Sequence, residues 1–299
     1  MNRLGLALSG GGFRATLYHL GVIRFLRDAQ ILPHVTHITA VSGGSILGAH
    51  LVQHWDKYCG SEDEFQDVAD AIVRFVQLDV RNRIVRRFPL ASAANSLMRF
   101  ARMGSRRSLT RAGLLEQHYE RYLYGDATLD ELPGRPQLHI MATNLSEGCL
   151  CSFNRNGLLL QRRARGKRDY FERVDIGLAT IPMAVAASSA FPGFFPPLEL
   201  RAWDVGADEG DFKTQAFTDG GVYDNLGLRM FRYIDQLSIH DTVTLTKADF
   251  LDLDNTMAVL KSADSLPERT PLRRIRQMIY RTLPHDQRDK ETRKMAVRP

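Results

Sequence analysis

Apolar and polar positions near the start of the chain follow a strand pattern, a tight turn and a helix pattern. Residues 4–8 (L-G-L-A-L) predict a short strand, and Gly10, Gly11 and Gly12 follow it almost at once. The next residues predict a helix with one apolar face, because apolar side chains recur at spacings of four, seven, eight and eleven: Tyr18, Val22, Phe25, Leu26 and Ala29.

The same order of strand, turn and helix returns around Ser42. Residues 37–41 are rich in β-branched side chains and predict a strand, and a helical apolar pattern follows the serine at Ile46, Leu47, Ala49, Leu51, Val52 and Trp55. This order is typical of a nucleophile elbow, which needs small residues two positions before and two after the serine. Ala40 and Gly44 meet this requirement.

Ser45 is the second candidate for the nucleophile. It has Gly43 before it but the bulky Leu47 after it, so turn sterics favour Ser42. We expect Ser45 to lie in the first helical turn, where its hydroxyl would satisfy a free backbone N–H as a cap.

The glycines at 10–12 predict an anion site, because backbone N–H groups at the start of a helix point into one concavity. A nucleotide phosphate is disfavoured, since the loop lacks G-x-G-x-x-G and the lysine of a P-loop. The alternative is the oxyanion that forms when a serine attacks an ester. Parallel strands in a βαβ unit would bring this loop beside Ser42.

Later elements are predicted in the same way. Residues 61–132 are mostly helical, and they begin with an apolar stripe at Phe65, Val68, Ala69, Ile72, Val73 and Phe75. Residues 138–144, 149–153 and 243–245 read as strands, and residues 181–190 read as a buried helix that has Pro182 in its first turn. At residues 217–221 an apolar strand end delivers Asp219 to a glycine turn. Asp219 is either the partner of the serine or a local cap of its own turn.

Basic residues outnumber acidic ones by 40 to 34, and they gather in the middle of the chain. Residues 81–111 contain no acidic residue, and their arginines alternate with apolar side chains. A segment of this kind suits docking on an anionic membrane, and a solvated arginine-rich cap or loop is the alternative. Nucleic acid is less favoured, because no recognisable nucleic-acid module accompanies the charge. The arginines are 81, 83, 86, 87, 99, 102, 106, 107 and 111.

Cysteine usage and hydropathy bear on the cellular location. Cys59, Cys149 and Cys151 are an odd number without zinc-site spacing, which favours a reducing compartment. Residues 4–8 are too short for a signal peptide, and the longest uncharged stretch, 176–197, contains prolines that do not suit a membrane span. We therefore expect a cytoplasmic protein that associates peripherally with membranes.

Taken together, these motifs resemble those of the patatin-like phospholipase family. The glycine loop, the Ser42 elbow and Asp219-Gly220-Gly221 occur in the family's order, and the loop string S-G-G-G-F-R-A looks most like that of the cytosolic phospholipases. Supporting matches are A-T-N-L-S-E-G at 142–148 and A-S-S-A-F-P-G-F-F-P-P at 187–197. Ala40 departs from the family, which usually has glycine there.

The resemblance implies an α/β fold with three α/β/α layers and a mostly parallel central sheet. The matching motifs cover about residues 3–228, and we assign an acyl hydrolase domain to residues 1–245, with the arginine-rich helical insertion at 81–111 inside it. Residues 246–299 would form a basic C-terminal extension.

The resemblance further implies a lipid acyl hydrolase that acts on (lyso)phospholipids with neither cofactor nor metal. Ser42 and Asp219 would form a catalytic dyad, Gly11 and Gly12 an oxyanion hole, and Arg14 would lie beside the lipid phosphate. The alternatives are a catalytically silent or nucleotide-responsive binding module, and a thioesterase or acyltransferase with the same dyad.

Histidines offer two further alternatives. A serine, acid, histidine triad would need His240 or His285, and neither lies in a motif. His50 and His54 are four residues apart on one predicted helix, a spacing that can bind a metal, but no acidic or cysteine ligand accompanies them. We interpret them as helix-surface histidines.

Overall fold

The computed structural model describes residues 4–78, 110–162 and 170–231, with the isolated positions 80, 83, 84, 86, 88, 233 and 234. The chain divides into a unit of residues 3–246 and a second unit made of residues 247–299 with the first two residues. All described residues belong to the first unit. The interior of the arginine-rich segment, the proposed strand at 243–245 and the extension at 246–299 lie outside them.

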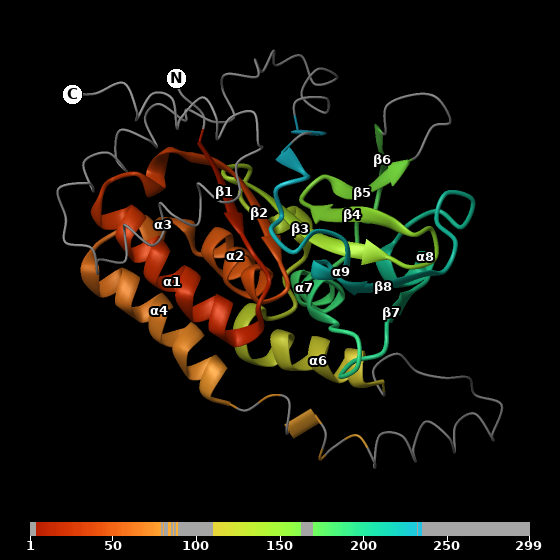
Figure 1. Ribbon diagram of the computed structural model, residues 1–299, viewed down its shortest axis with the longest axis horizontal. Helices are drawn as coiled ribbons and strands as arrows, with labels where there is room; N and C mark the ends of the chain where they lie inside the picture. Colours follow the sequence, from red (N-terminus) through yellow and green to blue (C-terminus); the bar gives the residue numbers. More distant parts are fainter. Residues whose placement is uncertain are drawn as a thin grey trace, which may run out of the picture. The chain divides into compact units, whose positions relative to one another are not determined.

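A mixed sheet of eight strands forms the centre of this unit (Figure 1). Its main path runs in the order β1, β2, β3, β4, β5, β6, and β8 pairs with both β3 and β7. The strands are β1 (Leu4–Leu8), β2 (Val35–Val41), β3 (Gln137–Asn144), β4 (Cys149–Asn154), β5 (Gly157–Arg162), β6 (Tyr170–Val174), β7 (Leu198–Leu200) and β8 (Gln215–Asp219).

The α/β class is confirmed, but the expectation of a mostly parallel sheet is wrong. Only β1 with β2 and β2 with β3 pair in parallel, and the other five pairings are antiparallel. Connection length explains the difference, because parallel neighbours need a long crossover and short turns join antiparallel strands. Helices join the first three strands, whereas only residues 145–148 separate β3 from β4, and only residues 155–156 separate β4 from β5.

Helices connect the parallel strands and cover one face of the sheet. Between β1 and β2 these are α1 (Gly12–Asp28) and η1 (Leu32–His34), and between β2 and β3 the described ones are α2 (Gly43–Gln53), α3 (Trp55–Cys59), α4 (Glu62–Gln77), α6 (Arg111–Tyr119), η3 (Glu120–Tyr124) and η4 (Leu129–Glu131). Later in the chain come α7 (Ile181–Ser189), α8 (Ala202–Val205) and α9 (Gly221–Asp224). Of these, η1 and η4 are 3₁₀ turns, and η3 is a π-helical turn that continues α6.

Helix α2 is the central helix of this layer. Every residue from Gly43 to Val52 is buried, as expected for a helix that is surrounded by other elements. A Cβ at Gly48 would lie 2.8 Å from the Cβ of Ala40, so α2 packs directly on β2. Figure 1 shows α1 and then α4 outside α2.

Helix α4 follows its predicted pattern closely. Ser61 and Glu64 form a capping box at its start, and its buried side chains are those of the predicted apolar stripe, apart from the partly buried Val73. The buried residues are Phe65, Val68, Ala69, Ile72 and Phe75.

The opposite face of the sheet is covered by α9 and the residues that follow it. A Cβ at Gly227 would lie 3.1 Å from Thr39 Oγ1 and 3.2 Å from Val41 Cγ2. A Cβ at Gly5 would lie 2.7 Å from the ring of Phe231. Alternate residues of β2 therefore serve the two layers, with Ala40 facing α2 and its two neighbours facing the segment after β8.

None of the helices in the described ranges combines the length and the hydropathy needed to cross a membrane.

Candidate active site

Ser42 lies at the sharp turn between β2 and α2. Its backbone angles, φ 51° and ψ −117°, fall in a region that residues with a side chain rarely adopt, and holding them costs about 1–3 kcal/mol. Gly43 begins α2 directly afterwards, and the carbonyl of Ser42 accepts the N–H groups of Ser45 at 2.9 Å and Ile46 at 3.2 Å. The predicted order of strand, serine and helix is therefore present in the fold.

Ser45 is buried in the first turn of α2, as predicted, but the expected cap is wrong. Its hydroxyl donates to the carbonyl of Ser42 at 2.6 Å, whereas a cap would accept from a backbone N–H. A hydroxyl inside a helical turn commonly bonds back to a preceding carbonyl, because that oxygen lies within its reach. The Ser45 hydroxyl thus stabilises the turn that contains Ser42.

Asp219 ends β8 and meets Ser42 because of the way two strands share one edge of β3. Val41, the last residue of β2, pairs with Met141, and Asp219 pairs with the next residue, Ala142. β2 is parallel to β3 and β8 is antiparallel to it, so their carboxyl ends meet head to head. The Ser42 hydroxyl donates to Asp219 Oδ2 at 2.6 Å.

The Asp219 carboxyl is buried, and each of its oxygens accepts a hydrogen bond. Its second oxygen, Oδ1, accepts the N–H of Gly221 at 2.7 Å. Burial raises the pKa of this carboxyl, although the bonds from Ser42 and Gly221 oppose the shift. A carboxylate with a raised pKa that already accepts a hydroxyl bond can take the proton of that hydroxyl when it attacks an electrophile.

The glycine loop reaches this pair from the end of β1. Gly11 and Gly12 have φ of 147° and 61°, which favour glycine, and both are exposed. A Cβ at Gly43 would lie 2.1 Å from the carbonyl oxygen of Gly12, and a Cβ at Gly10 would lie 3.4 Å from Ser42 Cβ. The glycine loop therefore lies beside the Ser42 turn, as predicted. The contact is so close that a side chain at Gly43 would collide with the backbone of Gly12.

Helix α1 begins at this loop and turns its amino end toward the site. The first N–H groups of a helix have no partner within it, so those after Gly11 are donors for a bound group. Arg14 lies exposed in the same first turn. Thr16, one turn further on, donates to the carbonyl of Gly43 at 2.7 Å and fastens α1 to the elbow.

Several residues at the site carried no role in the sequence interpretation. Ser188 accepts the N–H of Ser42, Thr143 donates to the carbonyl of Asp219 at 3.0 Å, and the carbonyl of Asn225 accepts the N–H of Gly10 at 2.9 Å. Ser188 stands in the string A-S-S-A, so a signal was present without an assignment. Its role depends on a contact 146 positions away along the chain, which no local pattern displays.

The interpretation of His50 as a surface residue is wrong. His50 is only 2% exposed, bonds to the hydroxyl of Tyr58 at 3.0 Å, and lies edge-on to the ring of His54. Burial, with His54 second, lowers its pKa to about 3, so it packs as a neutral ring. Nowhere in the described ranges do three or more metal-ligating side chains cluster.

In the part of the chain that the structure describes, no histidine hydrogen-bonds to Ser42 or Asp219. His240 and His285, the candidates for a triad, lie outside the described residues.

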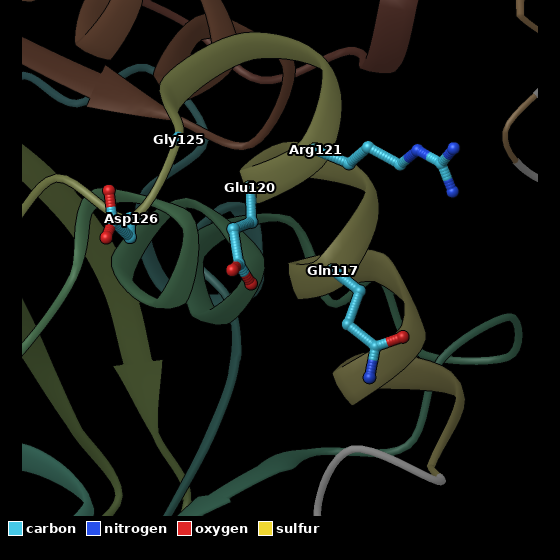
Figure 2. Close-up of a pocket in the computed structure, with 5 residues that line it drawn as sticks. All are labelled: Gln117, Glu120, Arg121, Gly125 and Asp126. Carbon is cyan, nitrogen blue, oxygen red and sulfur yellow. The ribbon is translucent and has the colours of Figure 1, made fainter.

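A separate hollow of about 500 Å³ lies at the junction of α6 and η3. Figure 2 shows its lining residues, with Arg121 directed away from Asp126. Neither Ser42 nor Asp219 lines it, so it is distinct from the site described above. The lining residues are Gln117, Glu120, Arg121, Gly125 and Asp126.

Comparison with solved structures finds distant similarity. Human GIVD cytosolic phospholipase A2 in complex with methyl gamma-linolenyl fluorophosphonate is 20% identical, with a TM-score of 0.39, over 53% of this chain and 23% of that one. Another structure of the human protein is 17% identical, with a TM-score of 0.40, over 63% of this chain and 28% of that one. VipD from Legionella pneumophila is 16% identical, with a TM-score of 0.34, over 75% of this chain and 46% of that one. The chain thus spans less than half the length of each.

No curated protein matches the sequence. The patatin-like phospholipase family, in contrast, matches residues 6–232, which include the glycine loop, Ser42 and Asp219. This match covers most of the chain and nearly all of its described residues, and the chain therefore belongs to the patatin-like phospholipase family.

Proposed function

We propose that this protein is a lipid acyl hydrolase that cleaves carboxylic esters of (lyso)phospholipids through a dyad of Ser42 and Asp219. The observation that carries the proposal is the 2.6 Å hydrogen bond from the Ser42 hydroxyl to the buried Asp219 carboxylate. Family membership supports the same reaction class.

The reaction would proceed in two halves. Ser42 Oγ bonds to the acyl carbon while its proton moves to Asp219, and the ester C–O bond breaks as the leaving alcohol takes that proton. Water then attacks the acyl-enzyme and gives its proton to Asp219. Release of the fatty acid returns the proton to Ser42 Oγ.

The tetrahedral intermediate of each half carries a negative oxygen. Backbone N–H groups of Gly11 and Gly12 would donate to it, which is consistent with their exposed position beside the elbow. Arg14 would attract the phosphate of the substrate from the same turn. This chemistry would need neither a metal nor a cofactor.

Exposed apolar side chains beside the pair support an acyl-lipid substrate. Phe191 and Phe194 are 54% and 47% exposed and follow Ala190, whose carbonyl accepts the N–H of Asp219 at 3.1 Å. Val222, three residues after Asp219, is 54% exposed. Apolar residues at the margin of a site suit contact with acyl chains. The arginine-rich segment at 81–111 would add attraction to an anionic bilayer.

The test compares wild-type protein with Ser42→Ala. Wild-type protein should react with a fluorophosphonate probe and release fatty acid from phospholipid vesicles, and Ser42→Ala should do neither. Lipid analysis of the products identifies the head group and the acyl position. If the probe does not label wild-type protein, the result would favour a catalytically silent binding module. If the probe labels it but phospholipids are not hydrolysed, turnover of thioesters would favour a thioesterase, and transfer of the acyl group to another acceptor would favour an acyltransferase.

A further inference from the structure

Helix α7 ends beside both members of the Ser42–Asp219 pair. The hydroxyl of Ser188 accepts the backbone N–H of Ser42 at 3.0 Å, and the carbonyl of the same residue accepts the N–H of Gly220 at 3.1 Å. Two residues on, the carbonyl of Ala190 accepts the N–H of Asp219. One short stretch of helix thus holds the backbone on both sides of the pair.

The Ser188 hydroxyl has a fixed orientation. A hydroxyl has one proton to donate, and Ser188 donates it to the carbonyl of Met141 at 2.6 Å. Its lone pairs are thereby left to face the N–H of Ser42. Ser188 is fully buried, so water does not replace either contact.

The bond from the Ser42 N–H to Ser188 forms at a strained position of the backbone. Ser42 holds an unfavourable backbone conformation, and such strain persists only where the surroundings over-determine it. Because Ser188 occupies its N–H, Ser42 does not have that group available for the oxyanion, which leaves this role to the glycine loop.

We propose that Ser188 is a positioning residue that sets the distance and direction between the Ser42 hydroxyl and Asp219. The inference rests on the proposed function. Ser188 makes no hydrogen bond to the reacting hydroxyl or to the carboxyl, and it acts through the backbone of Ser42 and Gly220.

Kinetics test this role with a matched control from the same helix. In Ser188→Ala, kcat on a soluble short-chain ester should fall by about ten- to hundred-fold with KM unchanged, because a shift of an ångström or less spoils the attack geometry. Ser188→Cys keeps a side chain of similar volume with a weak acceptor, so its kcat should lie between those of wild type and Ser188→Ala. Ser189→Ala removes a neighbouring hydroxyl that bonds Tyr119 and Val185, and it should keep wild-type kcat.

The pH profile reports whether the Ser42–Asp219 bond has changed. The bond from Ser42 lowers the pKa of the Asp219 carboxyl, and Ser188 makes no hydrogen bond to that carboxyl itself. A weakened Ser42–Asp219 bond in Ser188→Ala should therefore move the midpoint of the acid limb to a higher pH. An unchanged midpoint, or wild-type kcat in Ser188→Ala, would overturn the proposal. An equal loss in Ser188→Ala and Ser189→Ala would also overturn it, because it would indicate a general loss of packing.

A measurement without turnover keeps the inference separable from the proposed function. Amide hydrogen exchange at Ser42 should accelerate by about tenfold or more in Ser188→Ala and Ser188→Cys, but not in Ser189→Ala, since only the first two lose a strong acceptor. Unchanged exchange would refute the positioning role of Ser188. If Ser42→Ala keeps hydrolytic activity, the proposed function fails, but the exchange result still decides whether Ser188 holds the backbone of Ser42.

Discussion

Thr16 and Gly43 join the two glycine-rich turns of the site: the buried hydroxyl of Thr16 donates to the carbonyl of Gly43 at 2.7 Å. The same hydroxyl lies 3.3 Å from the carbonyl of Gly12. One side chain thus connects the start of α1 with the residue after Ser42, and the geometry of the proposed oxyanion hole depends on this connection.

Thr16→Val should therefore weaken both stability and catalysis. Valine keeps the shape but leaves the buried carbonyl of Gly43 without this donor, which costs about 1–3 kcal/mol. We expect a lower midpoint in urea unfolding and a lower kcat on a soluble ester. Thr36→Val is the control, since Thr36 bonds the distant carbonyl of Leu4 and should leave kcat unchanged. Equal kcat in both variants would contradict the link.

Asp219→Asn should abolish ester hydrolysis while the protein stays folded. The amide is nearly isosteric but does not accept the proton of Ser42, and loss of a general base lowers kcat by about 10²–10⁴-fold. Circular dichroism checks the fold and a fluorogenic ester checks the activity. Retained turnover in this variant, together with its loss in His240→Ala or His285→Ala, would indicate a conventional triad instead.

The same carboxyl predicts how stability depends on pH. Burial raises the pKa of Asp219 above its value in the unfolded chain, so the folded state binds this proton more tightly. Its contribution to stability is present below the unfolded pKa and is lost as pH rises through the folded pKa. Asp219→Asn should therefore be at least as stable as wild type at neutral pH. A thermal melt in which the variant unfolds well below wild type would contradict this.

Activity should respond to pH in the opposite direction. The reaction needs the ionised carboxylate, and a raised pKa moves loss of activity to a pH above that of an ordinary aspartate. The acid limb of kcat/KM against pH, measured on a neutral soluble ester, gives this midpoint. A midpoint at or below the ordinary value for aspartate would contradict the assignment of Asp219 as base.

Ser45→Ala should keep probe labelling and hydrolysis and lose some stability. The carbonyl of Ser42 retains the N–H groups of Ser45 and Ile46 as donors, so the loss of one hydroxyl bond costs about 0.5–1.5 kcal/mol. Mass spectrometry of the labelled peptide locates the adduct. An adduct on Ser45 rather than Ser42 would overturn the choice of nucleophile.

Replacing Phe191 and Phe194 with serine should lower activity on vesicles more than activity on a soluble ester. Both rings are exposed beside the end of α7 and would contact acyl chains rather than the protein core. The ratio of the two activities is the measurement, and Trp203→Ser is a control, because Trp203 is exposed on α8 and is not in the turn that follows Ala190. An unchanged ratio would remove this turn from substrate contact.

The local parts of the site could be predicted from sequence because their chemistry is local. A serine between a strand and a helix needs small neighbours, and a glycine loop before a helix needs positive φ, so both leave marks within a few residues. The family match over residues 6–232 agrees with that interpretation. The amphipathic stripe of α4 was predicted for the same reason, since its period is a property of the chain itself.

Contacts between distant residues were decided by the tertiary structure alone. The antiparallel pairings of the sheet and the burial of His50 each depend on which elements pack together in the folded chain. The meeting of Ser42 with Asp219 depends on β2 and β8 ending on consecutive residues of β3, although the two side chains are 177 positions apart. Periodicity and turn chemistry act over a few residues, whereas strand register is set by packing of the whole sheet.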